Sequence, residues 1–123
     1  MRIGIIVDNE FHNDVRVTNE VRHLQRKGHE LFVLCFNFGN KASIQNENFI
    51  IKKLPIQRKL KDILFASINN FPFYDLYWAY QIRKFIQEHK LEVIHVHDLY
   101  MARSGNIAKR KFNIPLVVDL HEN

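Results

Sequence analysis

Residues 92–98 read Glu-Val-Ile-His-Val-His-Asp, a short apolar strand that runs into two histidines and a carboxylate. A helix is expected directly after it, because Asp98 can cap a helix N-terminus. A second apolar strand, 115–120, leads into another group of polar residues: Asp119, His121, Glu122 and Asn123. In a parallel α/β sheet, ligands bind beyond the carboxyl ends of the strands. If these two strands are neighbours, their polar groups meet at one edge of the sheet.

Three earlier segments also have the character of buried strands. They are residues 2–8, 31–36 and 49–54, each a short and mostly apolar run. Such runs are typical of parallel sheets, whose strands are covered on both faces. Helices are predicted between the strands, over 14–27, 60–69 and 72–90, and again from Asp98 to Phe112. Gly28 suits the C-terminal cap of the first helix, and Asn113 suits that of the last.

Five strands with intervening helices predict an α/β fold. We expect a Rossmann-like, doubly wound parallel sheet in a single domain over residues 1–123. Right-handed crossovers favour the strand order 3-2-1-4-5. The switch point then lies between the first and fourth strands. The loops after Asp8 and after His97 are therefore expected to flank the ligand-binding cleft.

The chain is basic, with a net charge of +5 and a sequence pI of 9.5. Much of the excess lies in residues 52–61 and 109–111, which could attract phosphates or an anionic membrane surface. A solvated basic face is the simpler interpretation. No nucleic-acid-binding motif accompanies the charge, so no nucleic-acid partner is expected.

The sequence favours a reducing, cytoplasmic setting. The N-terminal apolar run is too short for the core of a signal peptide, and no run in the sequence is long enough to span a bilayer. Cys35 is the only cysteine, which excludes a disulfide framework within the chain. We therefore expect a cytoplasmic protein, with peripheral contact at the inner face of the membrane as an open question.

Several common catalytic motifs are missing. Residues 8–16 contain no glycine, so the G-x-G-x-x-G fingerprint of dinucleotide-binding enzymes is absent from the first loop. There is no P-loop and no G-x-S-x-G nucleophile elbow. The first loop instead offers Asn13 and Asp14 as helix caps and Arg16 as a bidentate donor. A helix N-terminus of this kind suits phosphate or pyrophosphate.

Two further interpretations remain open at this stage. His97, Asp98, His121 and Glu122 are ligands of the kind that zinc accepts, which would suit a metal-dependent hydrolase. His95 lies deeper in its strand and is expected to be a hydrogen-bonded core residue. The third interpretation is a non-catalytic, flavodoxin-like binding module.

Three segments together resemble a known family. The helix start Asp14-Val15-Arg16-Val17, followed by Glu20, Leu24 and the turn Gly28-His29-Glu30, resembles the first helix of family 4 (group 1) glycosyltransferases. Residues 93–98 resemble that family's "D-V-I-H-x-H" strand. Residues 114–122 resemble its "IP-V-V-x-T-x-H-D/E" strand. The resemblance covers almost the whole chain, and the segments occur in the family's order.

The resemblance implies the N-terminal domain of a two-domain GT-B enzyme. Such enzymes transfer a sugar from a nucleotide-sugar donor to a glycan, lipid or small-molecule acceptor with retention of configuration, usually without a metal. We therefore expect no cofactor and no metal, and a role such as polysaccharide biosynthesis. The C-terminal donor domain is absent from residues 1–123, so this truncated GT-B N-terminal domain is expected to be inactive alone.

The resemblance also implies roles for individual residues. His121 matches the histidine that faces the donor sugar, and it is the predicted catalytic residue. The predicted substrate-binding residues are Asn13, Asp14, Arg16, His97, Asp98 and Glu122. The loop before Val15 matches the segment that faces the donor phosphates, although the family's usual glycine pair is missing there. The basic and aromatic stretch 52–80 matches the variable region that confers acceptor choice or membrane contact.

Overall fold

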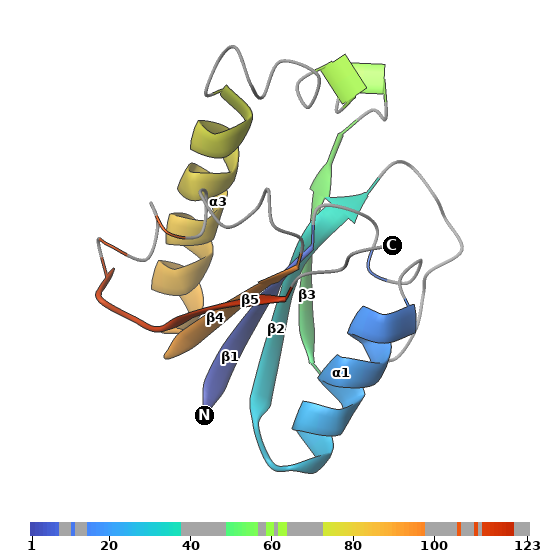
Figure 1. The fold of residues 1–123 in the computed structure, drawn as a ribbon, viewed down its shortest axis with the longest axis vertical. Helices are drawn as coiled ribbons and strands as arrows, with labels where there is room; N and C mark the ends of the chain where they lie inside the picture. The colour runs from blue at the N-terminus through green and yellow to red at the C-terminus, as the bar shows by residue number, and fades with distance from the viewer. Residues whose placement is uncertain are drawn as a thin grey trace.

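The structure is a computed structural model that describes residues 1–7, 11, 15–37, 49–56, 59–60, 62–63, 73–97, 106, 110 and 112–119. Figure 1 shows the arrangement of its strands and helices. They are β1 (Arg2–Ile6), α1 (Val15–Arg26), β2 (Glu30–Asn37), β3 (Ile50–Pro55), α3 (Phe73–His89), β4 (Val93–His97) and β5 (Leu116–Asp119). Residues 59–60, 62–63, 106, 110 and 112 are also helical.

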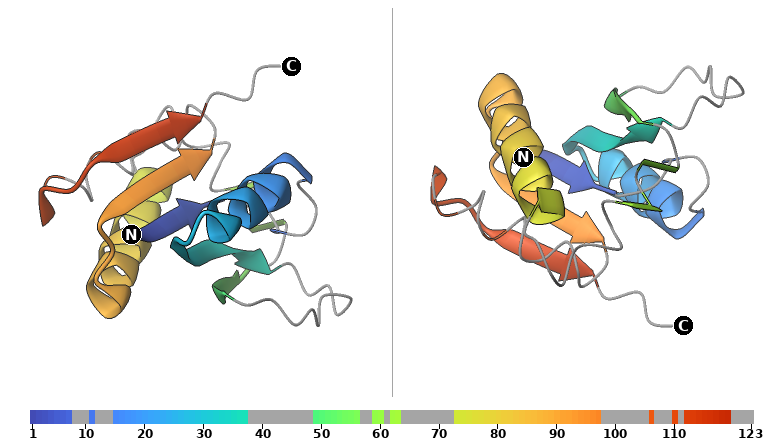
Figure 2. Two further views of the ribbon diagram at one scale, coloured as in Figure 1. Left: turned by 90° about the horizontal axis from the view of Figure 1, so that it is seen from below. Right: turned by 90° about the horizontal axis from the view of Figure 1, so that it is seen from above.

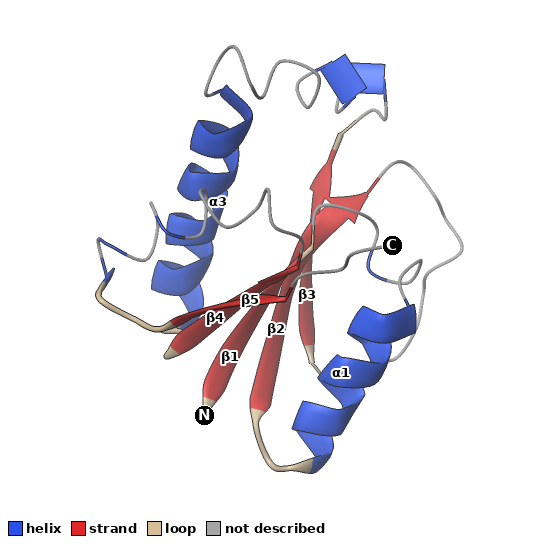
Figure 3. Ribbon diagram, viewed as in Figure 1, coloured by secondary structure: helices blue, strands red, loops and turns tan. Residues whose placement is uncertain are grey.

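The five strands form one parallel sheet in the order β3-β2-β1-β4-β5. This confirms the predicted fold class and strand order (Figure 3). β1 lies in the centre, with Ile5 paired to Val33 of β2 on one side and to His95 of β4 on the other. The switch point between β1 and β4 is therefore where the sequence predicted it.

The helices α1 and α3 cover opposite faces of the sheet (Figure 2). Successive residues of a strand point to opposite faces, so each strand contributes to two separate cores. Ile6 packs with Trp78 and Phe85 of α3 on one face. Ile5 packs with Val17 and Val21 of α1 on the other. Because both faces are covered, the central strands are apolar almost throughout.

The C-terminal end of α1 follows the predicted capping pattern. Gly28 has a φ of 92°, a left-handed conformation that glycine adopts without steric cost. Its N–H donates to the carbonyl of Gln25 at 3.0 Å. His23 and Arg26 lie in the last turn, where positive charge complements the helix dipole. The chain can therefore turn directly from α1 into β2.

A tight packing contact joins β1 to the segment before β4. A Cβ atom added at Gly4 would lie 2.5 Å from Cδ1 of Leu91, far inside van der Waals contact. Leu91 is buried and belongs to the core under α3. Glycine at this position lets the end of α3 pack closely on the central strand.

Helix α3 matches the predicted 72–90 helix closely, and its inward face carries Trp78, Ile82, Phe85 and Ile86. Much of the predicted 60–69 helix and of the helix after Asp98 lies outside the described residues. Asn113 has a φ of 52°, as expected for a left-handed cap. Among the described helices, none is long and apolar enough to cross a membrane.

Candidate functional site at the carboxyl end of β4

The carboxyl ends of the strands lie at one edge of the sheet (Figure 2). His97 is the last residue of β4, and its register partner is Asp119, the last residue of β5. The two groups of polar residues identified in the sequence therefore follow neighbouring strands. His121 follows Asp119 by two residues in the sequence.

The described residues include only two of the predicted site residues, Arg16 and His97. Arg16 is exposed in the first turn of α1. The others lie outside the described residues: Asn13, Asp14, Asp98, His121 and Glu122. Their predicted roles stay predictions.

His97 belongs to a cluster with His95 and Glu20 of α1. Nδ1 of His95 lies 2.7 Å from Oε1 of Glu20, and Nε2 of His97 lies 3.7 Å from Oε2 of the same carboxylate. The two imidazole rings stack with centroids 4.7 Å apart and planes 11° from parallel. Because the histidines are two residues apart on a strand, both point toward α1. This arrangement links α1 to β4 through a single carboxylate.

The burial of the cluster strengthens the attraction between the Glu20 carboxylate and the histidines. The side chain of His97 is 1% exposed, that of His95 15% and that of Glu20 25%. A 2.7 Å separation requires Nδ1 of His95 to donate its hydrogen to the carboxylate. Hydrogen bonds to an ionised group are worth about 1.5–3 kcal/mol, more than neutral ones. His97, predicted to bind substrate, is thus in contact with Glu20 below the surface.

Sequence reasoning did not identify Glu20 as a partner of the histidines. A signal was present, because Glu20 is three residues after Val17 and four before Leu24. That spacing puts a carboxylate beside the apolar stripe of the helix. A charged residue at the edge of a buried stripe needs a partner, and histidines on a facing strand are natural ones. What the sequence could not give was which strand faced that position.

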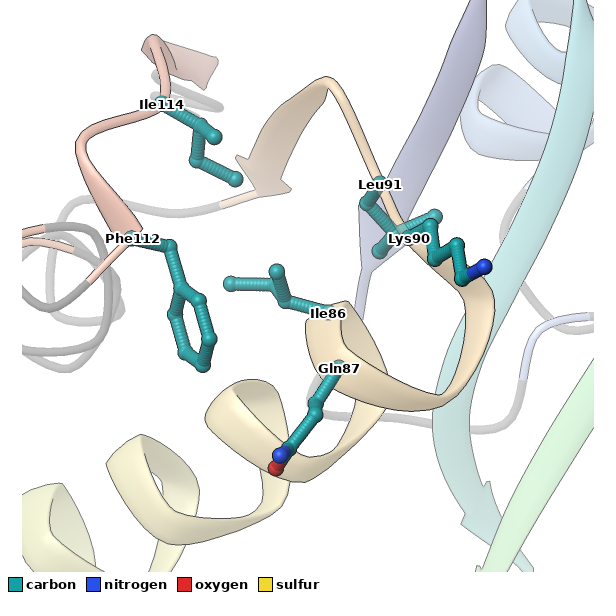
Figure 4. A pocket seen from close by; sticks show the side chains of 6 residues that line it. All are labelled: Ile86, Gln87, Lys90, Leu91, Phe112 and Ile114. Atoms are coloured by element: carbon teal, nitrogen blue, oxygen red, sulfur yellow. The ribbon is translucent and has the colours of Figure 1, made fainter.

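A cavity that is lined wholly by described residues lies at the other end of the sheet. It has a volume of about 310 Å³ and is lined by Ile86, Gln87, Lys90, Leu91, Phe112 and Ile114 (Figure 4). Leu91 and Ile114 precede β4 and β5, so this cavity opens near their amino ends. Ligands of parallel α/β sheets bind at the carboxyl ends instead. We therefore do not assign the substrate cleft to this cavity.

Comparison with known proteins identifies the family of the chain. A model of Glycosyltransferase Family 4 matches residues 14–123. No curated protein sequence matches the chain.

Three solved structures share the fold at low sequence identity. The C-terminal domain of a hydrogenase from Pyrococcus furiosus has a TM-score of 0.67 at 14% identity, with 97% of this chain and 90% of that chain covered. UDP-GlcNAc 2-epimerase from Methanocaldococcus jannaschii gives 0.61 at 14%, with 96% and 31% covered. MurG from Acinetobacter baumannii gives 0.57 at 16%, with 95% and 34% covered. The chain thus spans about a third of the last two proteins.

Proposed function

Because the chain belongs to glycosyltransferase family 4, we propose that it is the acceptor-side domain of a retaining glycosyltransferase. The enzyme would move a sugar from a nucleotide-sugar donor to a glycan, lipid or small-molecule acceptor. The observation that carries this proposal is the family match over residues 14–123, which includes α1, β4 and β5 and the residues that follow β4 and β5.

The arrangement of the sheet supports a substrate cleft at its carboxyl edge. β4 and β5 are adjacent there and end in register, His97 beside Asp119. Polar residues continue the chain beyond both ends: Asp98 after β4, and His121 and Glu122 after β5. In our proposal His121 faces the donor sugar, while Asp98 and Glu122 bind substrate.

The start of α1 supports a site for the donor phosphates. α1 follows β1, the strand beside the switch point, and no acidic side chain occupies its first turn. The positive end of its dipole favours an anion. Arg16 lies in the same turn, where its guanidinium can pair with phosphate oxygens. We propose that this turn contacts the pyrophosphate of the donor, and that Asn13 and Asp14, which precede it, also bind substrate.

The remaining features of the proposal concern partners and location. A second, donor-binding domain would complete the cleft, and no cofactor or metal would take part in the transfer. The protein would act in the cytoplasm, with peripheral membrane contact through the basic stretch that begins in β3. In this stretch Nζ of Lys52 lies 3.3 Å from Oε1 of Glu88 on α3, so part of the charge is already paired.

The test is nucleoside diphosphate release by the full-length parent protein. The protein is incubated with a panel of nucleotide sugars, including UDP-GlcNAc, together with extracted glycans and lipids as acceptors. We expect release from at least one donor, an unchanged anomeric configuration in the product, and undiminished activity in a chelator. Activity that the chelator abolishes would favour the metal-dependent hydrolase. A folded protein that binds no donor would favour the binding module.

A further inference from the structure

We propose that Glu20, His95 and His97 form a binding site for a divalent transition-metal ion of the zinc class. The site lies where α1 meets β4, beneath the carboxyl edge of the sheet. It does not depend on the proposed transfer reaction, in which no metal takes part. It also differs from the zinc ligands considered from the sequence, because only His97 is common to the two sets.

The spacing of the three side chains suits a small ion. One ligand atom from each residue lies within 4.8 Å of the other two. Zinc binds nitrogen and oxygen at about 2.0–2.2 Å, which places neighbouring ligand atoms of a tetrahedral site roughly 3.3 Å apart. The carboxylate oxygens lie 2.7 Å from His95 and 3.7 Å from His97, on either side of that value. Because an imidazole binds a metal in the plane of its ring, the two nearly parallel rings would also have to rotate. With that rotation, shifts of about an ångström would bring the three ligand atoms around one ion.

The ligand types select a class of metal. Two imidazoles with one carboxylate suit zinc and its transition-metal neighbours. Calcium and magnesium prefer sites made of oxygen ligands. In the absence of an ion, one carboxylate faces two histidines whose rings stack at 4.7 Å. A divalent cation would satisfy all three groups at once.

Burial and access both favour ion binding. His97 is almost fully enclosed, whereas Glu20 and His95 keep 25% and 15% of their side-chain surface exposed. An ion can therefore enter from the exposed side, and a water molecule can complete its coordination there.

The ion would link α1 to β4 through its ligands. Glu20 lies in the middle of α1, while both histidines lie on β4, which pairs with β1 at the switch point. An ion that binds the folded state but not the unfolded state stabilises the folded state by mass action. We therefore expect added zinc to raise the melting temperature without being required for turnover.

The test measures metal binding directly, on full-length protein without a histidine tag. Protein stripped with a chelator is titrated with Co²⁺, followed by its visible absorption, and with Zn²⁺, followed by calorimetry and melting temperature. We expect one ion per chain and a higher melting temperature. Glu20→Gln and His95→Gln are expected to weaken binding by roughly tenfold or more. His23→Gln alters an exposed histidine of α1 and is expected to bind as wild type does.

Two results would overturn the proposal. One is the absence of saturable Co²⁺ and Zn²⁺ binding to the folded wild-type protein. The other is equal affinity of the wild type and both cluster variants, because the ion would then lie elsewhere. Circular dichroism confirms that each variant is folded before titration. Donor turnover is measured separately, so that loss of the metal site and loss of the transfer reaction are distinguished.

Discussion

Glu20 is a polar link between α1 and β4 in the metal-free protein. Its carboxylate lies within 4 Å of ring nitrogens from both histidines of β4. Glu20→Gln keeps the shape of the side chain and removes its charge. We expect the free energy of unfolding, measured by urea denaturation in the presence of a chelator, to fall by about 1–2 kcal/mol.

A matched control tests whether burial causes that loss. Glu30 pairs with Arg2 at 2.8 Å, but its side chain is 65% exposed. Exposed ion pairs contribute about 0–1 kcal/mol, so Glu30→Gln is expected to change stability by less than Glu20→Gln does. Equal losses in the two variants would contradict the assignment of Glu20 as an anchoring residue.

Gly4 is a second residue whose identity is set by packing. Alanine there would place its Cβ 2.5 Å from Cδ1 of Leu91. We expect Gly4→Ala to destabilise the protein by about 1–3 kcal/mol, the usual cost of overpacking a core. In a Leu91→Val background, which lacks the clashing Cδ1 atom, the same change is expected to cost less. Additive losses in this double-mutant cycle would show that the two residues are not in contact.

At the scale of elements, α3 has one face buried against the sheet and another exposed, and residues two positions apart can lie on different faces. Trp78 is 0% exposed, whereas Tyr80 is 62% exposed. Trp78→Ala is expected to cost about 3–5 kcal/mol of unfolding free energy, and to lower the melting temperature accordingly. Tyr80→Ala is expected to stay within about 0.5 kcal/mol of wild type. Comparable losses would mean that the helix is rotated from the orientation described here.

Tyr77, on the same helix, gives a prediction about pH. Burial raises the pKa of its phenol above 10.0, since the apolar surroundings disfavour the charged form. Above pH 10 the unfolded state therefore loses this proton before the folded state does, and stability falls as pH rises. Tyr77→Phe is expected to show a shallower loss of stability in alkaline solution. The comparison uses urea denaturation of both proteins at neutral and alkaline pH. An identical slope for wild type and variant would contradict the assigned burial.

The elements themselves could be predicted because local patterns specify them. β1 and β2 are apolar on both faces, and α3 repeats its apolar residues at helical spacing. Gly28 and Asn113 were predicted to end helices because glycine and asparagine readily adopt a left-handed conformation. Both residues have that conformation in the structure. The contact of Glu20 with His95 could not be predicted in this way. It joins residues 75 positions apart, and it depends on how α1 packs across the sheet.

At the scale of the whole molecule, the strand order followed from few constraints. A right-handed crossover fixes the side on which each new strand is added, and an apolar strand must be covered on both faces. The substrate cleft was less accessible to such reasoning. A cleft depends on side chains beyond the strand ends, and in the proposed enzyme half of it would come from another domain.

The central claim is that the carboxyl edge of this sheet is one wall of a sugar-transfer site. The most direct measurement compares donor turnover by the full-length parent protein with that of His121→Ala, using His23→Ala as the control. We predict that His121→Ala lowers kcat by at least about 100-fold, since a group that acts on the reacting sugar contributes on that scale. The control is expected to keep wild-type activity, because His23 is exposed on α1. A folded His121→Ala protein with unchanged turnover would contradict the claim.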